Sequence, residues 1–358
     1  MSGRWKALVL VGALMAPAVL AGCSSPSTAS SGKVQILETG SSLLYPLFNE
    51  WQADYKTVAP NVQLTTQSTG SGTGITDATK GLAQIGASDA YLSDQQATAN
   101  PNILNIPLAI SAQQVNYNLP GLNSTHLKLS GPVLAGIYTG QITKWNDSKI
   151  AALNPGVTLP NHTIVPVVRS DGSGDTFLFT TYMTKSAPSI WTAGYSTTVN
   201  WPAVSAELSA EGNQGMEQAV KETPYSIAYI GISYLSQAIS DGLGYAALEN
   251  AAGNFVLPSS TTIQDAVKAA ATNVPKDERV SLVFSPGANS YPIINFEYAM
   301  VSKTQSSTAM ASALKALLTW ALNPQDGSAS KYLTPVHFQP LPAAVVALSK
   351  NQIAEITG

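Results

Sequence analysis

The sequence has little charge, a single cysteine and only three histidines. Charged residues make up 11% of the chain, against roughly 25% in an average soluble protein, so solvation depends on uncharged polar residues. A net charge of −3 lacks the basic excess of a general nucleic-acid binder. One cysteine excludes a disulfide framework, and His126, His162 and His337 lie too far apart for a paired-histidine motif. We therefore expect no nucleic-acid partner, no metal site and no cofactor.

The length and the apolar content indicate a folded protein of more than one domain. The chain has 358 residues, of which 44% are apolar, enough for substantial hydrophobic cores. At about 100–200 residues per domain, this length predicts two domains. No segment after residue 22 is long and apolar enough to predict a membrane span.

The first residues have the features of a bacterial export signal. Basic residues precede the apolar stretch 7–21, which is shorter than a membrane span of about 20 residues and suits a signal-peptide core. Residues 20–23 read Leu-Ala-Gly-Cys and resemble the lipobox, whose cysteine is acylated. We expect residues 1–22 to be a lipoprotein signal peptide and Cys23 to carry the lipid. The alternative is an ordinary secretory signal that contains a cysteine.

A Ser-rich segment, residues 23–33, follows this signal and predicts a solvated tether. More than one acyl chain, as on a bacterial lipoprotein, gives a stable anchor. We therefore expect an extracytoplasmic protein that is held by lipid at the outer face of the cell membrane.

Short apolar segments alternate with amphipathic ones from residue 34 onward. Alternation of this kind indicates an α/β architecture with largely parallel sheets. Strands are expected at 34–37, 62–67, 84–88, 103–110, 164–169, 226–230 and 293–301, and helices at 45–56, 75–81, 176–185 and 309–321.

Loops rich in glycine and hydroxyl residues follow a predicted strand and precede a predicted helix at three places. At the start of a helix, free N–H groups and the positive end of the helix dipole can hold an anion. One such loop is more often an ordinary helix cap, but three of them, one headed by Arg169, favour an anion pocket. The planar guanidinium group suits a tetrahedral oxyanion. The loops are TGSSLL (39–44), STGSGTG (68–74) and RSDGSGDT (169–176).

Asp89, at the end of a predicted strand, adds an acceptor to this candidate pocket. A carboxylate repels an anion unless the anion carries a proton that it can donate. Phosphate near neutral pH carries such a proton and sulfate does not, and an acceptor buried without a donor is costly. Taken alone, Asp89 fits a turn or cap residue better. Together with the three loops, it predicts selection of phosphate over sulfate.

The motifs of common enzymes are missing from these loops. None of their serines lies in GxSxG, and none of the loops fits GxxxxGK[ST] or GxGxxG. Asp171 and Asp175 have the wrong spacing for a DxDxT nucleophile. We therefore expect a binding protein and no enzyme, with a secreted phosphatase as the enzymatic alternative.

Several segments, in order along the chain, resemble the phosphate-binding proteins of the high-affinity phosphate ABC importer, the PstS family. The resemblance covers about residues 34–356 and is closest to the actinobacterial, mycobacterial-type lipoprotein members. The segments are ETGSSLLYPLFNEW, TGSGTGI, IGASDAYLS, AISAQQVNYNLPG, VVRSDGSGDTFLFT, AYIGISYL, YPIINFEYA and HFQPLP.

This resemblance implies a two-lobed α/β fold of the periplasmic-binding-protein type II. Each lobe would be a mixed, mostly parallel sheet flanked by helices, and crossover strands would join the lobes. Residues 34–113 together with 286–358 would form lobe I, and residues 114–285 would form lobe II. The implied partners are inorganic phosphate and the permease subunits of an ABC importer with a cytoplasmic ATPase.

The resemblance also implies the groups that bind phosphate. Asp171 would hold Arg169 by a salt link without touching the anion, and Thr176 would support the same loop. The implied ligands are Ser41, Ser42, Leu43, Ser71 and Asp89 from one lobe, and Arg169, Ser173, Gly174 and Asp175 from the other.

Asp175 departs from the pattern of the family. Many members have threonine directly after the glycine, where this chain has Asp175 followed by Thr176. A second carboxylate could accept the proton of a doubly protonated phosphate, or it could lie outside the groups that touch the anion. We favour the ligand role.

The expected function is therefore capture of phosphate for an ABC importer. The alternatives are a receptor for another tetrahedral oxyanion, such as sulfate or molybdate, and a surface adhesin as an added role.

Overall fold

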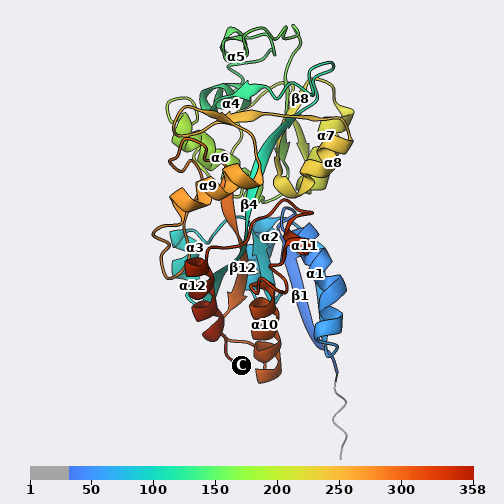
Figure 1. Cartoon of the computed structure of the whole chain (residues 1–358), viewed down its shortest axis with the longest axis vertical. Helices are drawn as coiled ribbons and strands as arrows, with labels where there is room; N and C mark the ends of the chain where they lie inside the picture. Colours follow the sequence, from blue (N-terminus) through green and yellow to red (C-terminus); the bar gives the residue numbers. More distant parts are fainter. Residues whose placement is uncertain (1–31) are drawn as a thin grey trace, which may run out of the picture. The chain divides into compact units, whose positions relative to one another are not determined.

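A long central strand, β4 (Ile103–Tyr117), belongs to both halves of the main sheet (Figure 1). Its residues 103–112 pair antiparallel with β12 (Ile294–Ser302). Its residues 113–117 pair antiparallel with β8 (Ser226–Gly231). The chain thus passes from one half of the sheet to the other within a single strand.

The structure is a computed structural model that describes residues 32–358. The predicted signal peptide (1–22), the predicted lipidation site Cys23 and nearly all of the predicted tether (23–33) lie outside these residues. No helix in the described range has the length and unbroken apolar sequence that a bilayer crossing requires.

One half of the main sheet contains the N-terminal strands and the C-terminal helices. Its elements are β1 (Val34–Gly40), α1 (Tyr45–Val58), β2 (Val62–Ser68), α2 (Ser71–Thr79), β3 (Ile85–Ser88), α3 (Asp94–Ala99), α10 (Thr308–Ala321), α11 (Ser330–Leu333) and α12 (Ala343–Ala354). β1 lies between β2 and β3 and pairs with both in parallel, whereas β12 pairs antiparallel with β3. α1 packs on β2, α2 on β3, α10 on β1 and α12 on β4.

The other half of the main sheet is built from the middle of the chain. Besides β8, the elements in this part of the chain are β5 (Lys128–Leu129), α4 (Gly131–Tyr138), α5 (Ser148–Leu153), β6 (Val165–Arg169), α6 (Gly174–Ser186), β7 (Leu208–Ala210), α7 (Gly212–Glu222), η1 (Ile232–Tyr234), α8 (Leu235–Ser240), β9 (Gly244–Tyr245), β10 (Ala247–Glu249), β11 (Phe255–Val256) and α9 (Ser260–Ala270). The strand order is β2-β1-β3-β12-β4-β8-β6-β7, with β9 also paired to β4. A small separate sheet has the order β11-β10-β5.

The predicted elements are present, with two informative differences. The expectation of largely parallel sheets holds for the outer strands, but β12 and β4 run antiparallel to their neighbours. The chain crosses between the halves through β4 and returns next to it through β12, so these two strands must point in opposite directions. The second helix begins at Ser71 and not at Ile75, because the glycine loop itself forms its first turn.

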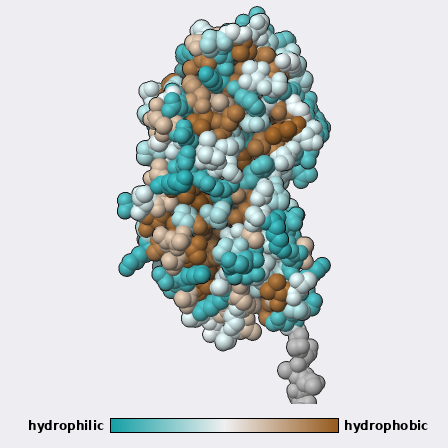
Figure 2. Space-filling view, in the orientation of Figure 1, coloured by the Kyte–Doolittle hydropathy of each residue, from teal (hydrophilic) through white to brown (hydrophobic). Residues whose placement is uncertain are grey.

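Helix α1 shows how the apolar pattern builds the core. Phe48, Trp51 and Tyr55 recur at helical spacing on one face and are buried. Trp320 of α10 packs edge-on against both Trp51 and Tyr55, with ring centroids 6.1 and 5.1 Å apart. The Trp51 indole N–H donates to the carbonyl of Gly327 at 2.9 Å. On the surface, hydrophobic and hydrophilic side chains are interspersed over the face seen in Figure 2.

Two buried glutamates, Glu38 and Glu278, are not part of the glycine loops. Glu38 of β1 accepts from the Thr66 hydroxyl, and burial raises its pKa to about 8. Glu278 accepts from Ser349 at 2.9 Å and from Gln352 at 2.5 Å, and burial raises its pKa to about 8 as well. Both carboxyl groups are therefore held protonated in the folded protein at neutral pH.

Folding stability should fall as the pH rises from about 5 to about 8. The folded state binds the Glu38 and Glu278 protons more tightly than the unfolded state, whose glutamates have an ordinary pKa near 4.5. This stabilisation is complete below the unfolded value and is lost as the pH passes through the folded value. Urea unfolding at both ends of this range measures the effect. Glu38→Gln should reduce the loss, and Glu50→Gln, at an exposed site of α1, should leave it unchanged. An equal loss in both variants would contradict the assignment.

Candidate anion-binding site

Four helices begin at one place between the two halves of the main sheet. α1 and α2 belong to one half, and α6 and α7 to the other. The N–H of Gly72, in the first turn of α2, donates to the carbonyl of Gly172 before α6 at 2.8 Å. The N–H of Asn213, in the first turn of α7, donates to Ser42 Oγ before α1 at 3.0 Å. The three loops predicted from the sequence therefore converge, and the start of α7 joins them.

The loop before α1 is braced by its own serines. Ser41 Oγ donates to the Asp89 carboxylate and accepts from the N–H of Leu43 at 3.1 Å. Ser42 Oγ accepts from both the backbone N–H and the side-chain amide of Asn213, each at 3.0 Å. Ser41 thus fixes this loop to Asp89, and Ser42 fixes it to the opposite half.

Asp89 lies at the centre of these contacts, directly after β3, and is only 2% exposed. Ser71 Oγ donates to Asp89 Oδ2 at 3.3 Å and accepts from the Asp89 N–H at 3.2 Å. The same Oδ2 faces Gly174, the first residue of α6, where a Cβ atom would lie 2.3 Å from it. The strand-end carboxyl is therefore enclosed by groups from both halves.

The surroundings of Asp89 favour its protonated form. Burial raises its pKa well above the ordinary value, and the nearby carboxyl groups of Glu297 and Asp175 raise it further. The Ser41 hydroxyl opposes this shift by donating to the carboxylate. The environment therefore favours a proton at this position, whether it is held by Asp89 or by a group that faces it.

Arg169, the last residue of β6, is the buried cation of the site. Its side chain is 1% exposed and forms a fork with Asp171 at 2.6 and 2.5 Å. Its remaining nitrogen, Nη1, donates to Asp175 Oδ2 at 3.0 Å. Burial alone would raise the pKa of Asp171, but the bonds and charge of Arg169 outweigh it and lower that pKa. The salt link between Asp171 and Arg169 that the resemblance implied is present.

Asp175 lies beside Arg169 and is completely buried. It accepts from the Asn213 amide at 2.6 Å and from the Gln113 amide at 3.0 Å. Burial raises its pKa, although Arg169 acts in the opposite direction. Asp175 is therefore placed among the converging groups, at the N-terminus of α6.

The remaining residues of the third loop cap α6. Ser173 Oγ accepts from the Thr176 N–H at 3.2 Å, and the Ser173 N–H donates to the carbonyl of Thr197 at 2.8 Å. The Thr176 hydroxyl bonds to Tyr229 Oη at 2.8 Å. Thr176 thus links the Ser173 cap of α6 to Tyr229.

Three residues of this cluster were not predicted from the sequence: Asn213, Gln113 and Glu297. Asn213 follows Glu211-Gly212 after the short strand β7 and opens α7, so it repeats the strand–glycine–helix pattern of the other loops and was detectable. Gln113 and Glu297 lie within the apolar strands β4 and β12, where a single polar residue gives no sign of the direction in which it points.

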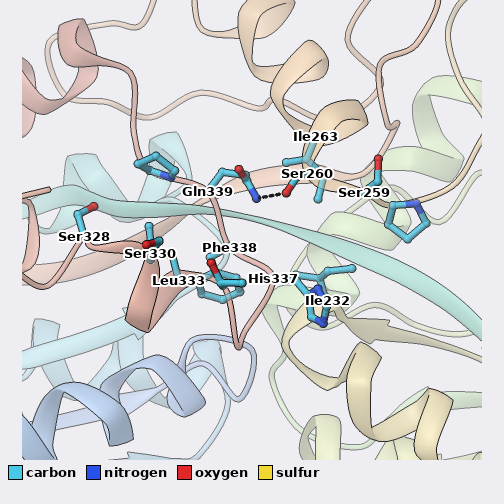
Figure 3. A pocket seen from close by; sticks show the side chains of 13 residues that line it. Ile232, Ser259, Ser260, Ile263, Ser328, Ser330, Leu333, His337, Phe338 and Gln339 are labelled. Carbon is cyan, nitrogen blue, oxygen red and sulfur yellow. Dashed lines mark hydrogen bonds between the residues drawn. The ribbon is translucent and has the colours of Figure 1, made fainter.

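Several hollows lie outside this cluster, and two of them are close to elements described above. One, of about 210 Å³, lies between α9 and the segment 328–340, where the side chains of Gln339 and Ser260 bond across it at 3.1 Å (Figure 3). The other, of about 710 Å³, is lined by Tyr91 and Phe177, each two residues beyond a carboxyl of the cluster. The second hollow therefore borders the converging loops. Within residues 32–358, no group of three or more His, Cys, Asp or Glu side chains is arranged to hold a metal ion.

Comparisons with known proteins show the family to which this chain belongs. A family model described as a PBP superfamily domain matches residues 25–325. A phosphate-binding protein PstS from Methanocaldococcus jannaschii is 34% identical, over 97% of this chain and 94% of that protein. Another PstS, from Xylella fastidiosa, is 33% identical over 90% of this chain and 85% of its own. A crystal structure of a phosphate-binding protein from Stenotrophomonas maltophilia superposes with a TM-score of 0.70 at 18% identity, over 89% of this chain and 93% of that one, and shows the same fold. The chain therefore belongs to the PstS family of phosphate-binding proteins, with the two-lobed α/β fold of the periplasmic-binding-protein superfamily.

Proposed function

We propose that this chain captures inorganic phosphate between the two halves of its main sheet and delivers it to an ABC importer without altering it chemically. Family membership supports the transport role. The observation that supports phosphate as the ligand is the position of Asp89. Its buried carboxyl group lies among helix N-termini, hydroxyl groups and one arginine. The site therefore combines many donors for an anion with a buried carboxyl group, Asp89, that can accept a proton of that anion.

Each half of the main sheet supplies part of the proposed ligand set. We assign one lobe to residues 34–113 with 286–358 and the other to residues 114–285, a division that lies near the point where β4 changes partners. Contacts such as Asn213 with Ser42 would hold the lobes together after phosphate has entered. The proposed ligands are Ser41, Ser42, Leu43, Ser71, Asp89, Arg169, Ser173, Gly174 and Asp175.

The proposed working environment is the outer face of the cell membrane, where the closed receptor would dock on its permease. The lipid carried by Cys23 would provide the anchor, with two or more acyl chains needed for stable attachment. A scavenger that works near ~1 μM ligand needs about −8 kcal/mol of net binding. Several charge-assisted hydrogen bonds in an enclosed site can supply this, and they must do so locally because the chain is net negative.

Calorimetry with phosphate, arsenate and sulfate tests this proposal. Phosphate and arsenate should bind, because both carry a proton near neutral pH, and sulfate should bind at least about 100-fold more weakly. Asp89→Asn should lower the preference for phosphate over sulfate at least about tenfold, because an amide can donate to sulfate.

The control for that variant is Asp94→Asn, at a fully exposed carboxyl close by in the sequence. It should bind all three anions as the wild type does. No heat from the wild type with phosphate would end the transport proposal. Tight sulfate binding by the wild type would favour a receptor for another oxyanion.

A further inference from the structure

A second buried carboxyl group, Glu297 of β12, lies directly behind Asp89. β12 pairs antiparallel with β3 so that Tyr298 is opposite Ser88, which brings the neighbouring residues Glu297 and Asp89 next to each other. The register of β12 against β4 shifts between Glu297 and Tyr298. Such irregularities redirect side chains and are common beside functional sites. Glu297 is completely buried, and its carboxyl group is close enough to that of Asp89 for each to shift the pKa of the other.

The hydrogen bonds of Glu297 engage only one of its two carboxyl oxygens. Its Oε1 accepts from the Ser111 hydroxyl and from the Asn295 amide at 2.9 Å. Its Oε2 has no donor among the residues that the structure describes. Two carboxyl groups in contact need a proton between them, because two carboxylates would repel each other in a dry environment.

The other charged groups around this pair make a shared proton necessary. Asp175 of α6 adds a negative charge that acts on both Asp89 and Glu297. Arg169 is already engaged with Asp175 and Asp171 and does not contact the pair. Tyr298, the next residue of β12, has a neutral phenol whose hydroxyl donates to the Glu278 carbonyl at 2.9 Å.

We propose that Glu297 is a specificity-determining residue, because it shares one proton with Asp89 and so prevents the cleft-facing oxygen of Asp89 from donating. A carboxyl pair with one proton holds that proton between its two members, whichever member carries it. The Asp89 oxygen that faces Gly174 is then an acceptor only. A ligand at this position must supply its own proton, which protonated phosphate does and sulfate does not.

The titration behaviour of the pair agrees with a single shared proton. Burial raises the pKa of Glu297 to about 7, with the charge of Asp175 adding to the shift, whereas the pKa of Asp89 is raised well above its ordinary value. Both shifts favour retention of a proton by the pair. Without Glu297, a buried Asp89 would still be protonated, but its proton would be free to point toward the ligand. Asp89 would then donate a hydrogen bond to sulfate, so that sulfate could bind.

Two variants separate this role from a purely structural one, on the basis of the proposed phosphate-binding function. Glu297→Met keeps most of the volume but has no group that can hold the proton of Asp89. It should lower the ratio of phosphate to sulfate affinity at least about tenfold, mainly by strengthening sulfate binding. Glu297→Gln can still accept from or donate to Asp89 and should keep the wild-type ratio within about threefold. Calorimetry with both anions measures the ratio.

If Glu297 had only a structural role, Glu297→Met would weaken the binding of phosphate and of sulfate equally. The ratio of the two affinities would then be unchanged. An unchanged ratio in folded Glu297→Met would therefore overturn the inference, whereas no phosphate binding by the wild type would instead overturn the proposed function. If Glu297→Met does not fold, infrared difference spectra of wild type and Glu297→Gln decide. The inference requires a protonated-carboxyl band in the phosphate-bound wild type that changes in Glu297→Gln. Identical spectra would refute it.

Discussion

Arg169→Met should abolish measurable phosphate binding and also destabilise the folded protein. Arg169 is the buried cation among the converging loops, and its guanidinium group bonds to both Asp171 and Asp175. Its removal takes away the only guanidinium group that we assign to the anion and leaves two carboxylates without their counter-charge. We expect phosphate affinity to fall at least about 100-fold. Breaking a buried ion pair on one side typically costs about 3–5 kcal/mol.

Calorimetry measures the first effect and urea unfolding measures the second. The matched control is Arg279→Met, because Arg279 also bonds to two aspartates, Asp94 and Asp277, but at the surface. Ion pairs with exposed carboxylates contribute little to folding stability, so this variant should unfold nearly as the wild type does. It should also bind phosphate as the wild type does, because Arg279 is not among the proposed ligands. Wild-type affinity in folded Arg169→Met would show that the anion binds elsewhere.

Gly174→Ala should prevent the site from closing without lowering the folding stability. A Cβ atom at position 174 would lie 2.3 Å from Asp89 Oδ2 and 2.6 Å from Asp89 Cβ. Asp89 is held by Ser41 and Ser71 and has little freedom to withdraw. The methyl group therefore keeps the two halves apart. Because alanine is favoured over glycine in a helix, the folding stability should not fall.

The expected result for Gly174→Ala is a loss of phosphate affinity of at least about 100-fold, with wild-type unfolding in urea. Small-angle scattering with saturating phosphate should show a wider particle than the wild type. Gly215→Ala is the control, since its added Cβ meets nothing closer than Ala210 Cβ at 3.6 Å. Phosphate affinity within about threefold of the wild type for Gly174→Ala would contradict this view of the closed site.

The site residues that could be predicted from sequence share a local signal. Ser71, Arg169 and Ser173 lie in short loops between a strand and a helix, where glycine and hydroxyl residues indicate anion binding once several such loops occur in one chain. Asp89 ends a strand, and it became a candidate only together with the three loops. Each of these signals depends only on neighbours along the chain, so no knowledge of the tertiary structure is needed to detect it.

Glu297 illustrates what local sequence could not supply. It interrupts an apolar strand, and its partner Asp89 is more than two hundred positions away in the chain. Their contact depends on β12 lying between β3 and β4, which is decided by packing across the sheet. The sequence predicted a mixed sheet but did not indicate that β4 and β12 are its antiparallel strands, because hydrophobic patterns indicate burial and not strand direction.

The shared strand β4 also limits how the molecule can move. Its backbone hydrogen bonds pass from β12 to β8 between residues 112 and 113, with no gap in the pairing. A rotation between the halves must therefore be absorbed by a few peptide units near that point. Such a short pivot converts small torsional changes into displacements that grow with distance from the axis. Surfaces far from residue 112, such as that of α5 at the top of Figure 1, would therefore move most. A transporter that contacts both halves at their outer ends would detect a bound ligand as a change in the distance between those ends.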